Sequence, residues 1–256
     1  MLSLLKLCLF LLIAGFLAGA MSSAAGLASL FSYPALLMAG LSPVIANVTN
    51  TYSLLASGFS SVAASRQELK GQKKKIIQIL PLTIIGVIIG ALLLFWVSAS
   101  FFKAIVPFFI FTAAILMVIP FKKRNSSGNQ SHAHHLFEYL GIFLVGVYAG
   151  YFGAGSGIVM LALLMMLFDD QNFAVNNALK NLTMVLTNII GALIYLFEAP
   201  ILWKYVIPMA IGFAFGGVVG PKIVRIVPEK IMRWVCFSFA MLLGFVLLFQ
   251  NLGIIK

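Results

Sequence analysis

Polar side chains stand at the start of two long stretches that are otherwise apolar. The first stretch opens with the letters NVTNT at positions 47–51, and the second opens with NNALKN at 176–181. Amide and hydroxyl groups inside a membrane helix need partners, so they either bridge helices or coordinate a ligand. Lys180 adds the one basic charge close to these groups. It would neutralise a bound anion, or else its ammonium would extend to the lipid headgroups.

Runs of small residues form a second pattern that fits ligand chemistry. FGAGSG at 152–157 offers consecutive backbone N–H groups ahead of a short predicted helix, and MSSAAG at 21–26 is its counterpart with two added hydroxyls. The start of a helix binds anions through its unpaired N–H groups and its dipole. The alternative is that small residues only allow helices to cross closely. The predicted substrate-binding residues are Ser22, Ser23, Asn47, Asn50, Thr51, Gly153, Gly155, Ser156, Gly157, Asn177, Lys180, Asn181 and Thr183.

The composition places these groups in a lipid-solvated protein. Hydrophobic residues make up 62% of the 256-residue chain and charged residues 9%, whereas soluble domains carry about a quarter charged residues. The apolar runs lack an alternating strand pattern, so we expect an all-α integral membrane protein, a polytopic helical bundle. The net charge of +11 comes from basic residues clustered in short connections. A nucleic-acid partner is therefore not expected.

An internal repeat divides the chain into two halves. Sliding the sequence by 131 positions places segment 15–26 on 146–157 and Asn50 on Asn181. We predict a first membrane repeat at 1–121, a cytoplasmic polar linker at 122–136 and a second repeat at 137–256, together forming one membrane domain. The expected elements are 3–20, 26–40, 44–64, 76–97 and 101–121 in the first half, and 137–151, 156–168, 174–197, 201–220 and 230–252 in the second.

The distribution of charge predicts how the halves are oriented. Segments 65–75 and 122–124 are strongly basic, whereas 198–204, the repeat equivalent of the first, is nearly neutral. Because basic loops stay in the cytoplasm, we expect a multi-pass plasma-membrane protein whose two repeats have inverted topology. Such repeats bind substrate near the midplane, where broken or short helices meet. Ten crossings and six are both compatible with the pattern.

Several sequence segments together carry a family resemblance. The combination of SYPALL, GLSPVIANVTNT and SRQELKG in the first half with GYFGAGSGI, NNALKN and TNIIGALIYLF in the second resembles the sulfite exporter TauE/SafE family over essentially the whole chain. The first small-residue segment carries fewer glycines than is usual in that family. The resemblance implies a membrane permease, a secondary transporter, for small anions that mostly contain sulfur, such as sulfite or sulfoacetate.

Two other functions compete with a permease. A passive anion channel shares every motif named above, whereas an intramembrane enzyme would need a base beside Ser156, and the three histidines all fall in the linker at 132–135. We expect no catalytic residues, no cofactor and no bound metal. The expected partners are a small anion and the lipid bilayer. The coupling ion, proton or sodium, and a homodimer are left open.

The topology prediction can be tested with single cysteines. Cysteine at Gly71 should be labelled from the cytoplasm, and cysteine at Ala199 from the outside, because basic segment 65–75 and neutral segment 198–204 are predicted on opposite faces. A membrane-impermeant thiol reagent applied to intact and to opened cells measures both. Labelling of the two positions from the same side would contradict the inverted repeat.

Overall fold

The computed structural model describes residues 4–96, 132–151, 153 and 155–251, together with Phe108, Phe111 and Ile115. These ranges hold helices and connecting turns and contain no strand, so the prediction of an all-α protein is confirmed. The first-half helices are α1 (Leu4–Ala25), α2 (Ser29–Met38), α3 (Pro43–Ala64), α4 (Arg66–Leu69) and α5 (Lys73–Trp96). The second-half helices are α7 (His132–Tyr151), α8 (Ser156–Leu167), α9 (Phe173–Glu198), α10 (Trp203–Ile226) and α11 (Glu229–Asn251).

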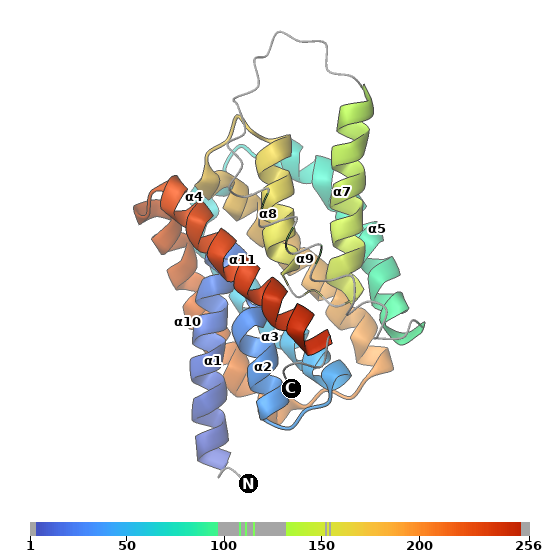
Figure 1. Ribbon diagram of the computed structural model, residues 1–256, viewed down its shortest axis with the longest axis vertical. Helices are drawn as coiled ribbons and strands as arrows, with labels where there is room; N and C mark the ends of the chain where they lie inside the picture. Colours follow the sequence, from blue (N-terminus) through green and yellow to red (C-terminus); the bar gives the residue numbers. More distant parts are fainter. Residues whose placement is uncertain are drawn as a thin grey trace.

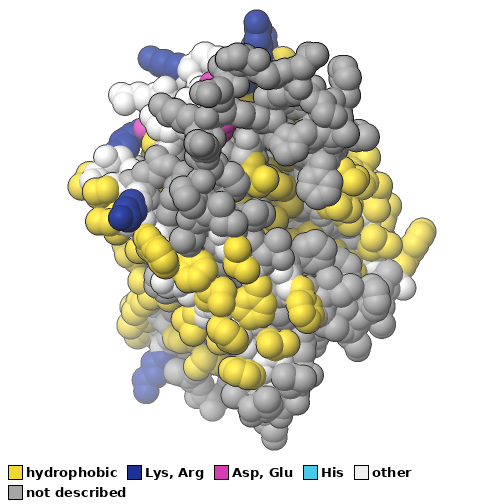
Figure 2. Space-filling model, turned by 45° about the horizontal axis from the view of Figure 1, so that its top comes forward, with side chains coloured by type: hydrophobic (Ala, Val, Ile, Leu, Met, Phe, Trp, Pro, Cys, Tyr) yellow, Lys and Arg dark blue, Asp and Glu magenta, His cyan; other side chains and the backbone are white. Residues whose placement is uncertain are grey.

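The outer surface is suited to lipid. Within the described residues, α1, α9, α10 and the Lys73–Leu94 part of α5 are long and apolar enough to cross a membrane. Large apolar side chains point outward from these helices, among them Phe197 and Ile207. Figure 2 shows a broad region of hydrophobic side chains below an end where basic side chains gather. Such a surface is stable only against hydrocarbon, which confirms a membrane protein.

Two helix pairs frame the bundle, with α3 and α9 between them (Figure 1). Helix α1 packs along α10, and α7 packs along α5. Glycines permit both contacts: a Cβ atom on Gly19 would lie 2.9 Å from the Cα of Phe213, and one on Gly86 would lie 2.8 Å from the amide nitrogen of Val147. Close backbone approach through small residues is the usual way in which membrane helices associate.

The inverted relation of the two halves stays a prediction, which this arrangement supports. Helices α1 and α7 occupy equivalent places in the repeat, and Figure 1 shows them entering the centre of the bundle from opposite ends. Each then gives way to a short helix, α2 or α8. No membrane boundary is defined, so the position of the breaks at a midplane also stays a prediction.

The two helix breaks touch each other. Gly26 ends α1 with a positive φ of 79°, and a Cβ atom on Gly157 would lie 2.7 Å from its Cα. The predicted meeting of the breaks is thus confirmed. The predicted extent of the first break is wrong, because α1 stays helical through Ala25 and the interruption is confined to positions 26–28. Serine and alanine are compatible with a helix, so only the glycine stops it.

The first helix of the second half begins earlier than predicted. Helix α7 starts at His132, five positions before the predicted start at 137, so the histidines are placed on its first turns and not in a flexible tether. The segment HAHHLFEY contains neither glycine nor proline, and nothing in it interrupts a helix. Most of the expected element 101–121 and the rest of the linker lie outside the described residues.

Two ion pairs tie the halves together at the predicted cytoplasmic end. Arg225 of α10 donates to both carboxylate oxygens of Glu68 at 2.6 and 2.9 Å. Lys75 of α5 donates to Asp170 at 3.1 Å. The hydrogen bond from Arg225 is the largest cause that lowers the pKa of Glu68. The side chain of Asp170 is exposed, so this pair lies at the surface.

Gly157→Ala should destabilise the protein, because its new methyl group overlaps the backbone of Gly26. Overpacking of this kind costs about 1–3 kcal/mol. Gly191→Ala is the matched control, since a Cβ atom there meets only the Cγ2 of Thr51 at 4.0 Å and alanine favours a helix. Thermal unfolding in detergent measures both. Equal midpoints for the two variants would contradict the close contact of the breaks.

Candidate functional site

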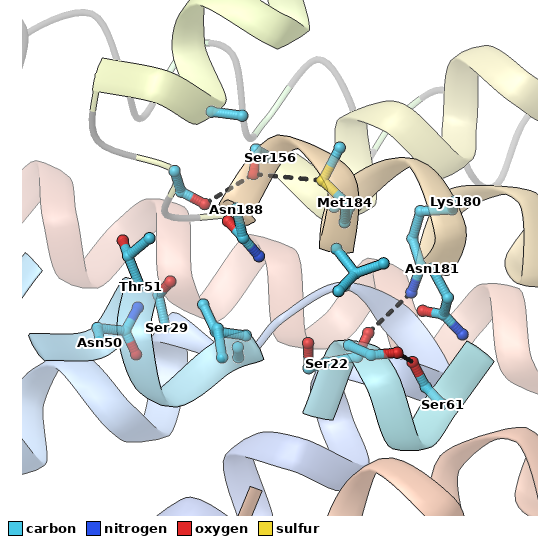
Figure 3. Close-up of a pocket in the computed structure, with 18 of the residues that line it drawn as sticks. Ser22, Ser29, Asn50, Thr51, Ser61, Ser156, Lys180, Asn181, Met184 and Asn188 are labelled. Atoms are coloured by element: carbon cyan, nitrogen blue, oxygen red, sulfur yellow. Dashed lines mark hydrogen bonds between the residues drawn. The ribbon is translucent and has the colours of Figure 1, made fainter. Parts of the chain in front are cut away.

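A small polar cavity of about 50 Å³ lies where the breaks meet, between α3 and α9. Figure 3 shows polar side chains of both halves pointing into it. Nine of the thirteen predicted site residues line it: Ser22, Asn47, Asn50, Thr51, Gly153, Ser156, Gly157, Lys180 and Asn181. The structure therefore brings most of the predicted residues to one place.

Side chains of α9 satisfy the carbonyl groups at the end of α1. The ammonium of Lys180 donates to the carbonyl oxygen of Ser22 at 2.8 Å, as Figure 3 shows. Asn177 and Asn181 donate to the carbonyl oxygen of Ser23 at 2.8 and 3.0 Å. The last carbonyls of a helix lack intrahelical partners and carry a partial negative charge. An ammonium and two amides are suitable donors for them.

Lys180 is not a residue that extends to the headgroups. Its exposed fraction is 1%, and its ammonium is held inside the bundle. The interpretation as a lysine reaching the lipid surface is wrong, because the α1 carbonyls lie within reach and attract a cation. An unpaired charge in this setting would be very unfavourable, so the carbonyl contacts explain how the ammonium is tolerated.

The starts of α2 and α8 present backbone N–H groups in place of carbonyl groups. Their N-cap residues are Ala28 and Gly155, and neither provides a side-chain cap. By contrast, Asn172 caps α9 by accepting a hydrogen bond from the amide of Val175 at 2.9 Å. Residues Gly26 and Ser29 at the start of α2, with Ser156 and Gly157 at the start of α8, line the cavity. The cavity is therefore bordered by two helix starts whose N-cap residues provide no side-chain cap. At the α8 start, the amides of Ser156 and Ile158 donate to the backbone carbonyls of Gly153 and Gly155.

The end of α7 is held by neutral donors. Tyr195 donates its hydroxyl to the carbonyl oxygen of Gly150 at 2.6 Å, and the Asn47 amide reaches the carbonyl oxygen of Tyr151 at 3.5 Å. Both breaks thus have their carbonyl ends engaged by side chains. The negative ends of α1 and α7 offset the positive ends of α2 and α8. Among the described residues that line the cavity, Lys180 is the one with a formal charge.

One side of the cavity carries amides and hydroxyls. Asn50 and Thr51 of α3 lie there with Ser29 and Asn188 (Figure 3). The Oδ1 atom of Asn50 is buried and has no hydrogen-bond partner among the described residues. The Ser156 hydroxyl donates to the carbonyl oxygen of Gly153 at 2.9 Å and lies 3.9 Å from the sulfur of Met184. It would have to leave this hydrogen bond to donate to a ligand.

Four predicted site residues do not line the cavity. Ser23 turns its hydroxyl back to the carbonyl oxygen of Gly19, and Thr183 does the same toward Leu179. Asn177 is occupied at the end of α1, and Gly155 forms the left-handed N-cap of α8 with φ of 74°. Each of them supports a helix end or its own helix, and a direct role in substrate binding stays a prediction.

The sequence reasoning missed several lining residues. Most of them are small or apolar, and the rest are polar residues that stand apart from the polar motifs: Gly26, Ala28, Ser29, Leu54, Gly58, Ser61, Ala149, Met184, Val185 and Asn188. Helical spacing could have found some of them. Positions 47, 51, 54, 58 and 61 follow one face of α3, and 181, 184, 185 and 188 follow one face of α9.

A bundle of apolar helices that encloses a polar cavity at two helix breaks has the architecture of a membrane transporter. The chain belongs to the sulfite exporter TauE/SafE family, whose model matches residues 11–247. Its relatives carry names of the same class. It is 28% identical to a probable membrane transporter protein of Haemophilus influenzae, over 86% of both chains. It is 27% identical to the probable membrane transporter protein YfcA of Escherichia coli, over 93% of this chain and 88% of that one. No solved structure matches the chain significantly.

Contact between Gly58 and Val185 narrows the cavity, because a Cβ atom on Gly58 would lie 2.6 Å from the Cβ of Val185. Gly58→Ala should destabilise the protein by about 1–3 kcal/mol, and adding Val185→Ala should recover most of the loss. Unfolding midpoints of both single variants and the double variant measure the coupling. If the shifts in unfolding midpoint of the two single variants simply add in the double variant, α3 and α9 are not in direct contact at this point.

Proposed function

We propose that the protein is a secondary transporter for small anions, with a sulfur oxyanion such as sulfite as its substrate class and the cavity at the helix breaks as its binding site. Membership of the sulfite exporter family supports the sulfur chemistry. The names of the relatives state only that they are probable membrane transporters. The choice of an anion rests on the groups that line the cavity.

The proposal rests on one observation: at the two breaks, side chains engage the backbone carbonyl groups but do not cap the helix starts. Carbonyl ends are engaged by Lys180, Asn181 and Tyr195, among others. The helix starts at Ala28 and Gly155 have no side-chain cap. A cation entering the cavity would therefore find the carbonyl groups of the two breaks occupied and an ammonium nearby, with the Oδ1 atom of Asn50 as the unpartnered acceptor among the described lining residues. An anion would find donors and a positive charge, which replace the hydration that it loses.

The size of the cavity favours a compact substrate. Its volume of about 50 Å³ exceeds the roughly 10–15 Å³ that one water molecule needs. It therefore holds a few water molecules, comparable in bulk to a pyramidal oxyanion. A longer organosulfonate such as sulfoacetate would require the cavity to widen.

Lys180→Met should lower the specificity constant for sulfite about 10- to 100-fold, because a charge-assisted hydrogen bond contributes roughly 1.5–3 kcal/mol. The fold should survive. The Ser22 carbonyl keeps the amide of Gly26 at 2.8 Å, and the Ser23 carbonyl keeps the two asparagines. Lys204→Met is the control, since Lys204 is exposed and lies outside the cavity.

Uptake into proteoliposomes, screened with sulfite, thiosulfate, sulfate, sulfonates and small carboxylates, measures the effect at equal reconstituted protein. Accumulation of sulfite against its gradient, driven by protons or sodium, separates a transporter from a passive channel. Near-normal sulfite flux in Lys180→Met would remove the electrostatic role of this residue. Wild-type protein that moves none of these anions would overturn the proposed function.

A further inference from the structure

Helix α9 carries a capping group on each side of its cavity-lining stretch. Lys180 reaches the end of α1, and Tyr195 reaches the end of α7. The residues between them that line the cavity run from Asn181 to Asn188. Lys180 also lines the cavity, whereas Tyr195 is not among the lining residues. Tyr195 therefore acts on the site indirectly, through the groups that its hydroxyl holds.

The hydroxyl of Tyr195 lies at the point where α7 gives way to the break. It donates to the carbonyl oxygen of Gly150, and the next carbonyl along, that of Tyr151, accepts from Asn47. Asn47 also contacts the Tyr195 hydroxyl. Tyr151 is the last residue of α7, and the chain needs only four more positions to reach the start of α8. The orientation of the α8 start therefore depends on where these two carbonyls are held.

The ring of Tyr195 is anchored independently of its hydroxyl. The side chain is 1% exposed and packs with Val48 of α3 and Ala91 of α5. Helices α3 and α5, together with α9 itself, thus hold the ring in place. The position of the ring in turn fixes the position of the hydroxyl. A donor presented in this way loses little conformational freedom when it forms its hydrogen bond, so it can hold the α7 end in one position.

We propose that Tyr195 is a positioning residue for anion binding: by holding the Gly150 carbonyl it sets the direction of the α8 start and of the Ser156 and Gly157 groups that face the cavity. This inference rests on the proposed function of the cavity as an anion site. It assigns the neutral cap of α7 a task distinct from that of Lys180, which supplies charge. Loss of the hydroxyl should weaken anion binding and leave the charge in place.

Tyr195→Phe removes only the hydroxyl and keeps the anchored ring. Tyr52→Phe is the matched control, because the Tyr52 ring packs against the same cluster and its hydroxyl also donates to a backbone carbonyl, that of Ala192 within α9, at 2.5 Å, and not to the end of α1 or α7. Initial rates of radiolabelled sulfite uptake in proteoliposomes separate KM from the maximal rate. We expect the KM of Tyr195→Phe to rise about 2- to 10-fold, the range of a single hydrogen bond. The KM of Tyr52→Phe should match that of the wild type.

Amide hydrogen exchange in detergent gives a second readout that needs no substrate. Exchange at positions 156–159 should speed up in Tyr195→Phe and stay unchanged in Tyr52→Phe, since only the first variant releases the α7 end. An unchanged KM together with unchanged exchange in Tyr195→Phe would overturn the positioning role, and so would equal effects in the two variants. Wild-type protein without sulfite uptake would instead refute the proposed function, and the exchange data would then decide the role of Tyr195 alone.

Discussion

Backbone groups inside an apolar bundle must find partners, and the site depends on how this requirement is met at two broken helices. A continuous helix satisfies its own N–H and C=O groups, whereas each break leaves several of both kinds without intrahelical partners. At the ends of α1 and α7, side chains from α3 and α9 donate to carbonyls. At the starts of α2 and α8, the N-cap residues are alanine and glycine, which have no side-chain acceptor. The proposed anion site relies on this difference for its backbone donors.

Helix α9 connects the two breaks mechanically. Its start is fixed by the Asn172 cap and by Asn176, whose amide donates to the carbonyl oxygen of Phe168 at the end of α8. Further along, its side chains hold α1 and then α7. A displacement of α9 would therefore change the hydrogen bonds at both breaks together. In a transporter that must expose one site to each side in turn, this coupling links the two halves through a single element.

Local signals made the helices predictable, whereas the inner contacts required the fold. Pro43 at the first position of α3 and the Asn172 cap of α9 mark boundaries within one residue of those expected. The end of α1 was placed too early, because nothing local distinguishes Ser22 and Ser23 from a helical turn. The role of Tyr195 depends on a carbonyl 45 positions away, and the capping of α1 by Lys180 spans 158 positions. Sequence spacing shows that such groups share a helix face, but not which backbone group they meet.

The carbonyl partner of Lys180 explains how a buried ammonium could attract the proposed anion. The described residues that line the cavity include no acidic residue. A carboxylate about 4 Å from the ammonium would contribute roughly 4 kcal/mol at an effective dielectric constant of 20. A free anion would have to displace that carboxylate, at a loss of about a thousandfold in affinity. Helix carbonyls carry only a fraction of a charge, so the hydrogen bond to Ser22 holds the ammonium without a full negative charge that the proposed anion would have to displace.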